Sequence, residues 1–141
     1  MDANHARTLL LTQHQAIRTS LEACREIAKR LRTNDADETE LELALERMRA
    51  EVYQHNLSET ELIRPLLAHT QRWGDRLVDR MLEEHLAEHV AMWSVLDQAA
   101  RTVAFEIEEL ADDLDAHMAA EERTFLAPHV LREDVIANHE K

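Results

Sequence analysis

The chain has 141 residues and a formal net charge of −13, a length that suits one domain with a single core. The acidity excludes the basic surface that nucleic-acid binding requires, and it disfavours contact with an anionic membrane. One glycine, two prolines, 4% aromatic residues and 32% charged residues are typical of a helical protein.

Cysteine usage and the absence of targeting patterns suggest where the protein works. Cys24 is the chain's one cysteine, which suits a reducing compartment, and its place on an apolar stripe favours a packing role. The first residues lack the basic and apolar regions of a secretory signal, and no apolar run has the roughly 18 residues of a membrane span. We therefore expect a cytoplasmic protein without a nucleic-acid or membrane partner.

Four segments carry apolar residues at alternating spacings of three and four, the pattern of bundle helices. A turn-forming stretch at 33–37 and the glycine at Gly74 separate the first three segments, and a poorly marked break near 101–105 precedes the fourth. The chain predicts an all-α, up-down-up-down antiparallel four-helix bundle that forms one domain over 1–141. The predicted helices cover about 3–32, 38–70, 75–100 and 105–128, followed by a short tail at 129–141.

Polar residues interrupt each apolar stripe near its middle. In the second, third and fourth segments they are four residues apart and therefore share one helix face. The midpoints between successive interruptions fall in or near the three breaks, so in antiparallel neighbours all of them lie at one height. The sequence therefore predicts one polar layer across the core. Its members are His14, His55, Glu59, His85, His89, His117 and Glu121.

A metal site is one explanation of this layer, and a hydrogen-bonded network without metal is the other. Each unpartnered polar side chain would cost about 1–3 kcal/mol, against a total stability of about 5–15 kcal/mol. Imidazoles and carboxylates are ligands of transition metals, and seven are too many for one tetrahedral zinc ion. Two six-coordinate ions, bridged by the carboxylates and by oxo or hydroxo, would keep about one position open for a small molecule.

The ordered set of ligands resembles the hemerythrin / HHE cation-binding family over about residues 8–130. The motifs that carry it are His14, His55-x-x-x-Glu59, His85-x-x-x-His89 and His117-x-x-x-Glu121. The resemblance implies a four-helix bundle with two non-haem iron ions, bridged by carboxylates and by oxo or hydroxo. It further implies that His85, His89 and His117 bind one iron. His14 and His55 would bind the other, which keeps the open position, and Glu59 and Glu121 would bridge.

Two acidic residues after the last histidine could serve as the bridging ligand. Invertebrate oxygen carriers of the family have an aspartate five residues after that histidine, where this chain has Glu122, whereas Glu121 comes four residues after it. Helical register favours Glu121 as the bridging ligand. The His-x-x-x-Glu ending is more similar to the HHE branch, which does not favour simple oxygen transport.

Three functions fit such a centre. The first is the binding of dioxygen or a related small oxidant at the open iron position. The second is an enzyme that turns over hydrogen peroxide, as a catalase does, or nitric oxide. The third is an iron or oxygen sensor that acts through a separate partner. An apolar pocket would favour the first function and a polar or open pocket the second, and the seven ligands are common to both.

Overall fold

The computed structural model describes residues 3–34, 36–67, 75–124 and 126–127. Within these residues the chain forms four helices and no strands, which confirms the predicted all-α class. The helices are α1 (Ala3–Arg32), α2 (Glu38–Leu67), α3 (Asp75–Leu96) and α4 (Ala100–Arg123). The predicted tail at 129–141 and the last turn of the second predicted helix, 68–70, lie outside the described residues.

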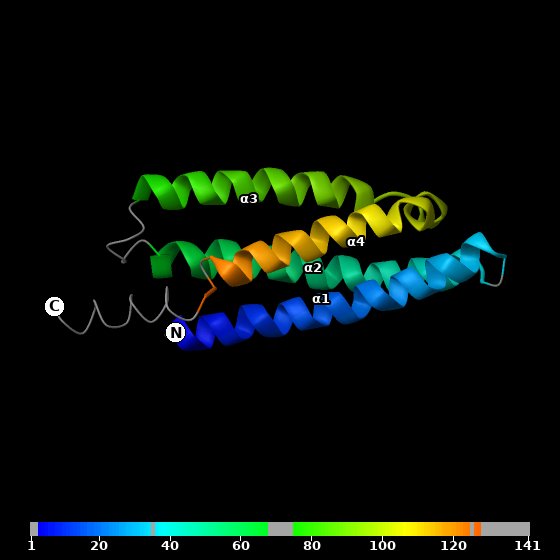
Figure 1. Ribbon diagram of the computed structural model, residues 1–141, viewed down its shortest axis with the longest axis horizontal. Helices are drawn as coiled ribbons and strands as arrows, with labels where there is room; N and C mark the ends of the chain where they lie inside the picture. The colour runs from blue at the N-terminus through cyan, green and yellow to red at the C-terminus, as the bar shows by residue number, and fades with distance from the viewer. Residues whose placement is uncertain (1–2, 35, 68–74, 125, 128–141) are drawn as a thin grey trace.

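Successive helices run in opposite directions, so the bundle has the predicted up-down-up-down order (Figure 1). α1 packs against α2 and α4, and α3 packs against the same two helices. This arrangement places the middle of each helix beside the middles of its neighbours. In the part of the chain that the structure describes, no helix is long and apolar enough to cross a membrane.

The main apolar core lies at the end of the bundle where α1 leads into α2 and α3 leads into α4. Leu21, Leu45 and Ile107 are fully buried there, each at a position that the apolar spacing predicts. Cys24 belongs to the same core, and burial raises the pKa of its thiol to about 11. The thiol therefore stays protonated at neutral pH, as a packing residue does.

Two residues explain the predicted turn between α1 and α2. Asn34 has a φ of 63°, a left-handed conformation that asparagine adopts more readily than most residues. The Asp37 carboxylate accepts a hydrogen bond of 2.9 Å from the Glu40 amide and caps the start of α2. The turn chemistry read from this stretch therefore matches its structure.

The connection between α3 and α4 differs from the prediction. α3 ends at Leu96 and α4 begins at Ala100, rather than at about 100 and 105. Arg49 of α2 donates hydrogen bonds of 2.9 Å to the carbonyl oxygens of Leu96 and Gln98. These bonds satisfy carbonyls that the end of a helix leaves without partners. Because the donor lies on another helix, the residues around the break do not mark it.

The end of α4 also comes earlier than predicted, at Arg123 instead of about 128. The Thr124 hydroxyl donates to the carbonyl of Ala120 at 2.7 Å, and Arg7 of α1 donates to the carbonyl of Leu126 at 2.7 Å. The Ala120 carbonyl also accepts from the Thr124 amide at 3.1 Å, so the side chains of Thr124 and Arg7 add hydrogen bonds to carbonyls at and just beyond the end of the helix.

Candidate metal centre

The seven residues of the predicted polar layer lie together inside the bundle. All four helices contribute, because each apolar stripe faces the bundle axis and each interruption lies at the same height. α1 supplies His14, α2 supplies His55 and Glu59, α3 supplies His85 and His89, and α4 supplies His117 and Glu121. The five imidazoles point Nε2 toward one another and toward the two carboxylates.

One half of the cluster lies between α1, α2 and α4. His14 Nε2 is 3.1 Å from His55 Nε2 and 2.9 Å from Glu121 Oε1. His55 Nε2 is 2.7 Å from Glu59 Oε1. All four residues are buried, and each offers one ligand atom within 4.8 Å of the others. Two imidazoles and two carboxylates at this separation are suited to hold one metal ion.

The other half includes the histidines of α3. His85 Nε2 is 2.7 Å from Glu121 Oε2, and His117 Nε2 is 3.5 Å from the same oxygen. With Glu59 they form a second group whose ligand atoms lie within 4.8 Å of one another. His89 lies beside this group, with its Nε2 3.2 Å from His117 Nε2 and 3.6 Å from Glu59 Oε2.

Each carboxylate faces both halves. Glu121 directs Oε1 to His14 and Oε2 to His85, and Glu59 directs Oε1 to His55 and Oε2 to His89. The two groups of four therefore share Glu59 and Glu121. This is the arrangement that two adjacent ions with two bridging carboxylates require.

The burial of Glu59 tests whether a cation fits. The residue is 2% exposed, and within the described residues neither of its oxygens accepts a hydrogen bond of normal geometry. A buried carboxylate oxygen that accepts no hydrogen bond and binds no cation lowers the free energy of unfolding by roughly several kcal/mol. A cation between the two carboxylates would supply what both oxygens lack.

The outer nitrogens of three imidazoles have partners that orient the rings. His14 Nδ1 lies 2.6 Å from Glu122 Oε2, and His117 Nδ1 lies 2.6 Å from Glu88 Oε2. Donation from Nδ1 fixes the tautomer that keeps Nε2 free for a metal. Glu122, which also forms an ion pair with Arg18, thus faces outward while Glu121 faces the cluster. Glu121 belongs to the groups of side chains that could hold a metal ion, and Glu122 does not.

Gln13, the partner of the third imidazole, is a residue that the sequence did not single out. His55 Nδ1 lies 2.8 Å from Gln13 Oε1, so a carboxamide of α1 orients a histidine of α2. Gln13 directly precedes His14, and this proximity is the only sequence signal of its role. Glutamine one residue before a ligand is otherwise indistinguishable from an exposed helix position.

A family model described as the hemerythrin HHE cation binding domain matches residues 5–134 of this chain. The chain belongs to this family. No curated protein and no solved structure matched the chain in the same comparisons. Membership agrees with the clusters of histidine and glutamate, since proteins of the family hold metal ions.

The electrostatics of the HHE domain reflect the crowding of these groups without a cation. Burial disfavours a charged His55, but the nearby carboxylates of Glu121 and Glu59 outweigh this and raise its pKa to about 9. Burial and the nearby Glu121 carboxylate raise the pKa of Glu59. Burial and the neighbouring imidazoles of His117 and His85 lower the pKa of His89 to about 4. Without metal ions, protons on His55 and Glu59 therefore balance part of the negative charge in the cluster.

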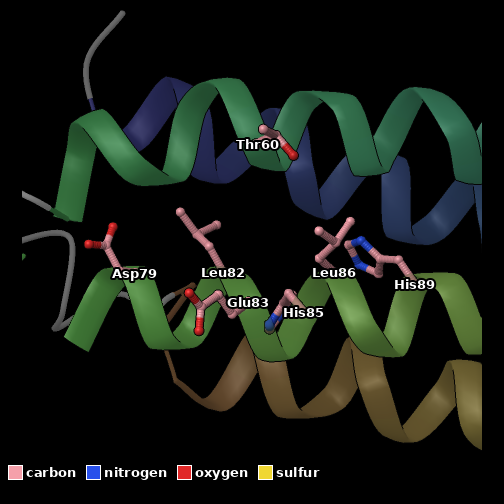
Figure 2. Close-up of a pocket in the computed structure, with 7 residues that line it drawn as sticks. All are labelled: Thr60, Asp79, Leu82, Glu83, His85, Leu86 and His89. Carbon is pink, nitrogen blue, oxygen red and sulfur yellow. The ribbon is translucent and has the colours of Figure 1, made fainter. Parts of the chain in front are cut away.

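A cavity of about 300 Å³ reaches the HHE site from the side of α3 (Figure 2). Leu82, Leu86 and His89 on α3 face Thr60 on α2 across it. The rest of its lining includes His85 and the carboxylates of Asp79 and Glu83. A small molecule that enters between α2 and α3 therefore meets two of the clustered histidines.

A larger groove of about 580 Å³ continues along the same two helices past Thr60, Leu86 and His89. Its walls are mainly apolar and include Leu57 and Val90, together with the aromatic rings of Tyr53 and Trp93. The approach to the site therefore combines a cavity of mixed polar and apolar lining with a mainly apolar groove.

Proposed function

We propose that the protein holds two iron ions and binds dioxygen or a related small oxidant at them. His14 and His55 would bind one ion, His85, His89 and His117 the other, and Glu59 and Glu121 would bridge the two. The observation that carries this proposal is the pair of four-residue groups that share both carboxylates. The buried oxygens of Glu59, which accept no hydrogen bond of normal geometry from the described residues, support it, because a bridging position would satisfy both.

Two adjacent iron ions held by these residues would supply a binding position for a small oxidant and two electrons to share with it. The chain's own residues prepare this chemistry in three ways. Glu122 and Glu88 hold the Nε2 atoms of His14 and His117 toward the centre. The apolar core on one side of the layer excludes water. The cavity beside His85 and His89 gives small molecules a route to the centre.

Turnover of hydrogen peroxide or nitric oxide is the second candidate, and the composition of the cavity favours it. Thr60, Asp79 and Glu83 line the cavity beside His85 and His89. Hydroxyl and carboxyl groups there can relay protons, which reduction of a peroxide consumes and reversible binding of dioxygen does not. A wholly apolar entrance would have favoured binding alone.

The deciding experiment measures metal per chain on protein purified without added metal, with an absorption spectrum of the same sample. We expect about two irons per chain and a near-ultraviolet charge-transfer band of a bridged ferric pair. The protein is then reduced without air and exposed separately to dioxygen, hydrogen peroxide and nitric oxide. Reversible spectral change with dioxygen supports binding, and sustained consumption of peroxide or nitric oxide supports turnover. A chain that takes up no ferrous iron would refute both.

A further inference from the structure

Gln13 connects α1 to α2 beside the centre and makes a hydrogen bond at each end of its carboxamide. Its Oε1 lies 2.8 Å from His55 Nδ1, and its Nε2 donates to Ser58 Oγ at 2.9 Å. Ser58 is buried on α2, three residues after His55. Gln54 also donates to the Ser58 hydroxyl, at 3.5 Å. In this arrangement the hydroxyl oxygen accepts from both amide nitrogens, and the Gln13 amide oxygen faces His55.

The direction of the Gln13 amide decides which nitrogen carries the single proton of a neutral His55 imidazole. A carboxamide oxygen accepts only, so opposite Oε1 the imidazole must carry its proton on Nδ1. In the neutral, metal-binding form of His55, Nε2 then carries the lone pair, on the side of the ring where oxygens of Glu59 and Glu121 lie 2.7 and 3.5 Å away. A reversed amide would move the proton to Nε2, and His55 could not bind a metal ion.

The partner of His55 also differs in charge from the partners of two other clustered histidines. His14 and His117 donate to the carboxylates of Glu122 and Glu88, both at 2.6 Å. A carboxylate partner makes an imidazole a more basic ligand, and a neutral amide does so less. His14 and His55 would bind the same ion, so that ion has one histidine with a charged partner and one with a neutral partner.

We propose that Gln13 is a positioning residue for the metal ion of the His14 and His55 half. It holds His55 Nε2 free for the ion, and its neutrality keeps His55 a weaker electron donor than His14. This inference rests on the proposed metal centre and adds a residue that acts on it through His55. A carboxylate at the same place would stabilise the more highly charged oxidation state of that ion.

Two substitutions separate the two parts of this role. Gln13→Leu removes the acceptor, and Gln13→Glu keeps an acceptor but adds a negative charge. Gln15 is exposed on the same helix two residues later, so Gln15→Leu and Gln15→Glu are matched controls. Each protein is stripped of metal and titrated with zinc in a calorimeter. We expect Gln13→Leu to weaken the binding of one of the two zinc ions roughly 10- to 100-fold. Gln13→Glu should bind both ions at least as tightly as the wild type, and both controls should bind like the wild type.

Two further measurements respond to orientation and charge and not to packing alone. Nitrogen-15 NMR of the zinc-loaded protein should show His55 with a proton on Nδ1 that is protected from exchange with water. In Gln13→Leu this proton should lose its protection. In the iron-loaded protein, Gln13→Glu should lower the reduction potential, and Gln15→Glu should not. A role confined to packing would change the unfolding midpoint in Gln13→Leu but would leave the potential of Gln13→Glu at the wild-type value.

The outcomes distinguish this role from the proposed function. A wild-type chain that binds neither zinc nor iron refutes the metal centre, and the role with it. Full metal binding that is indifferent to Gln13, or a zinc-loaded His55 with its proton on Nε2, refutes the role alone. Should Gln13→Leu not fold, Ser58→Ala tests the same amide direction, with a smaller loss of zinc affinity expected than for removal of the acceptor.

Discussion

The two halves of the centre differ in how the bundle covers them. The side chains of His14 and His55 are 0% and 3% exposed, whereas those of His85 and His89 on α3 are 16% and 11% exposed. The covered half lies among three helices that pack against one another, and the open half borders the cavity between α2 and α3. The same ligand chemistry therefore meets two environments, one suited to retention of a metal ion and one to access from solvent.

The bridging carboxylates join the halves, and their removal should have the largest effect. Glu121 contacts histidines of both halves through its two oxygens, so we expect Glu121→Gln to lose both metal ions. Of the clustered histidines, its neighbour Glu122 contacts the outer side of His14, so Glu122→Gln should keep both ions with weaker affinity. Metal content per chain measures this difference. Full metal in Glu121→Gln would contradict the proposed bridge.

In the metal-free protein, a histidine of the covered half should contribute more to stability than a histidine of the open half. His14→Ala removes a fully buried ring together with its contacts to Glu121 and Glu122, so the free energy of unfolding should fall by about 3 kcal/mol. His89 borders the cavity, and His89→Ala should cost about 1 kcal/mol or less. Urea denaturation of both variants gives the comparison. Equal losses would mean that the halves are equally packed.

Stability should depend on pH differently with and without metal. In the folded chain the pKa of His55 is raised from 6.5 to about 9, so the native state holds a proton that the unfolded chain releases in this window. The metal-free protein should therefore lose roughly 3 kcal/mol of stability as pH rises from about 6.5 to 9. The raised pKa of Glu59 acts in the same direction, and the lowered pKa of His89 acts only at more acidic pH.

Metal ions compete with this proton, so affinity for metal should rise over the same pH window. Thermal melts of metal-free and zinc-loaded protein between pH 6.5 and 9 test both statements. A metal-free protein whose stability increases across this range would show that His55 is not held protonated by the two carboxylates.

The smallest expected effect concerns access. Leu86 lines the cavity beside His89, and Leu43 is equally exposed elsewhere on α2, at 64% each. Leu86→Trp should fill part of the cavity and slow the reaction of the reduced protein with peroxide or nitric oxide roughly threefold, a barrier increase below about 1 kcal/mol. Leu43→Trp serves as the control in stopped-flow experiments. Unchanged rates in both variants would place the route to the centre elsewhere.

The sequence by itself determined the four stripes and the polar layer within them. Helical spacing fixes which residues share a face, so His55 with Glu59 and His117 with Glu121 could be paired without coordinates. Antiparallel order then fixes their height, because residues equally far from a turn lie side by side. The same register favoured Glu121 over Glu122 as a ligand, which stays a prediction, and the structure shows that Glu121 lies in the cluster.

Only the tertiary structure decided what depends on contacts between helices. Arg49 of α2 ends α3 at Leu96, and Gln13 of α1 orients His55 of α2. Neither partner is marked in its own segment, since each bond joins residues more than forty positions apart. The unequal cover of His14 and His89 is decided in the same way, because spacing along one helix says which side chains turn inward but not how closely the neighbouring helices pack over them.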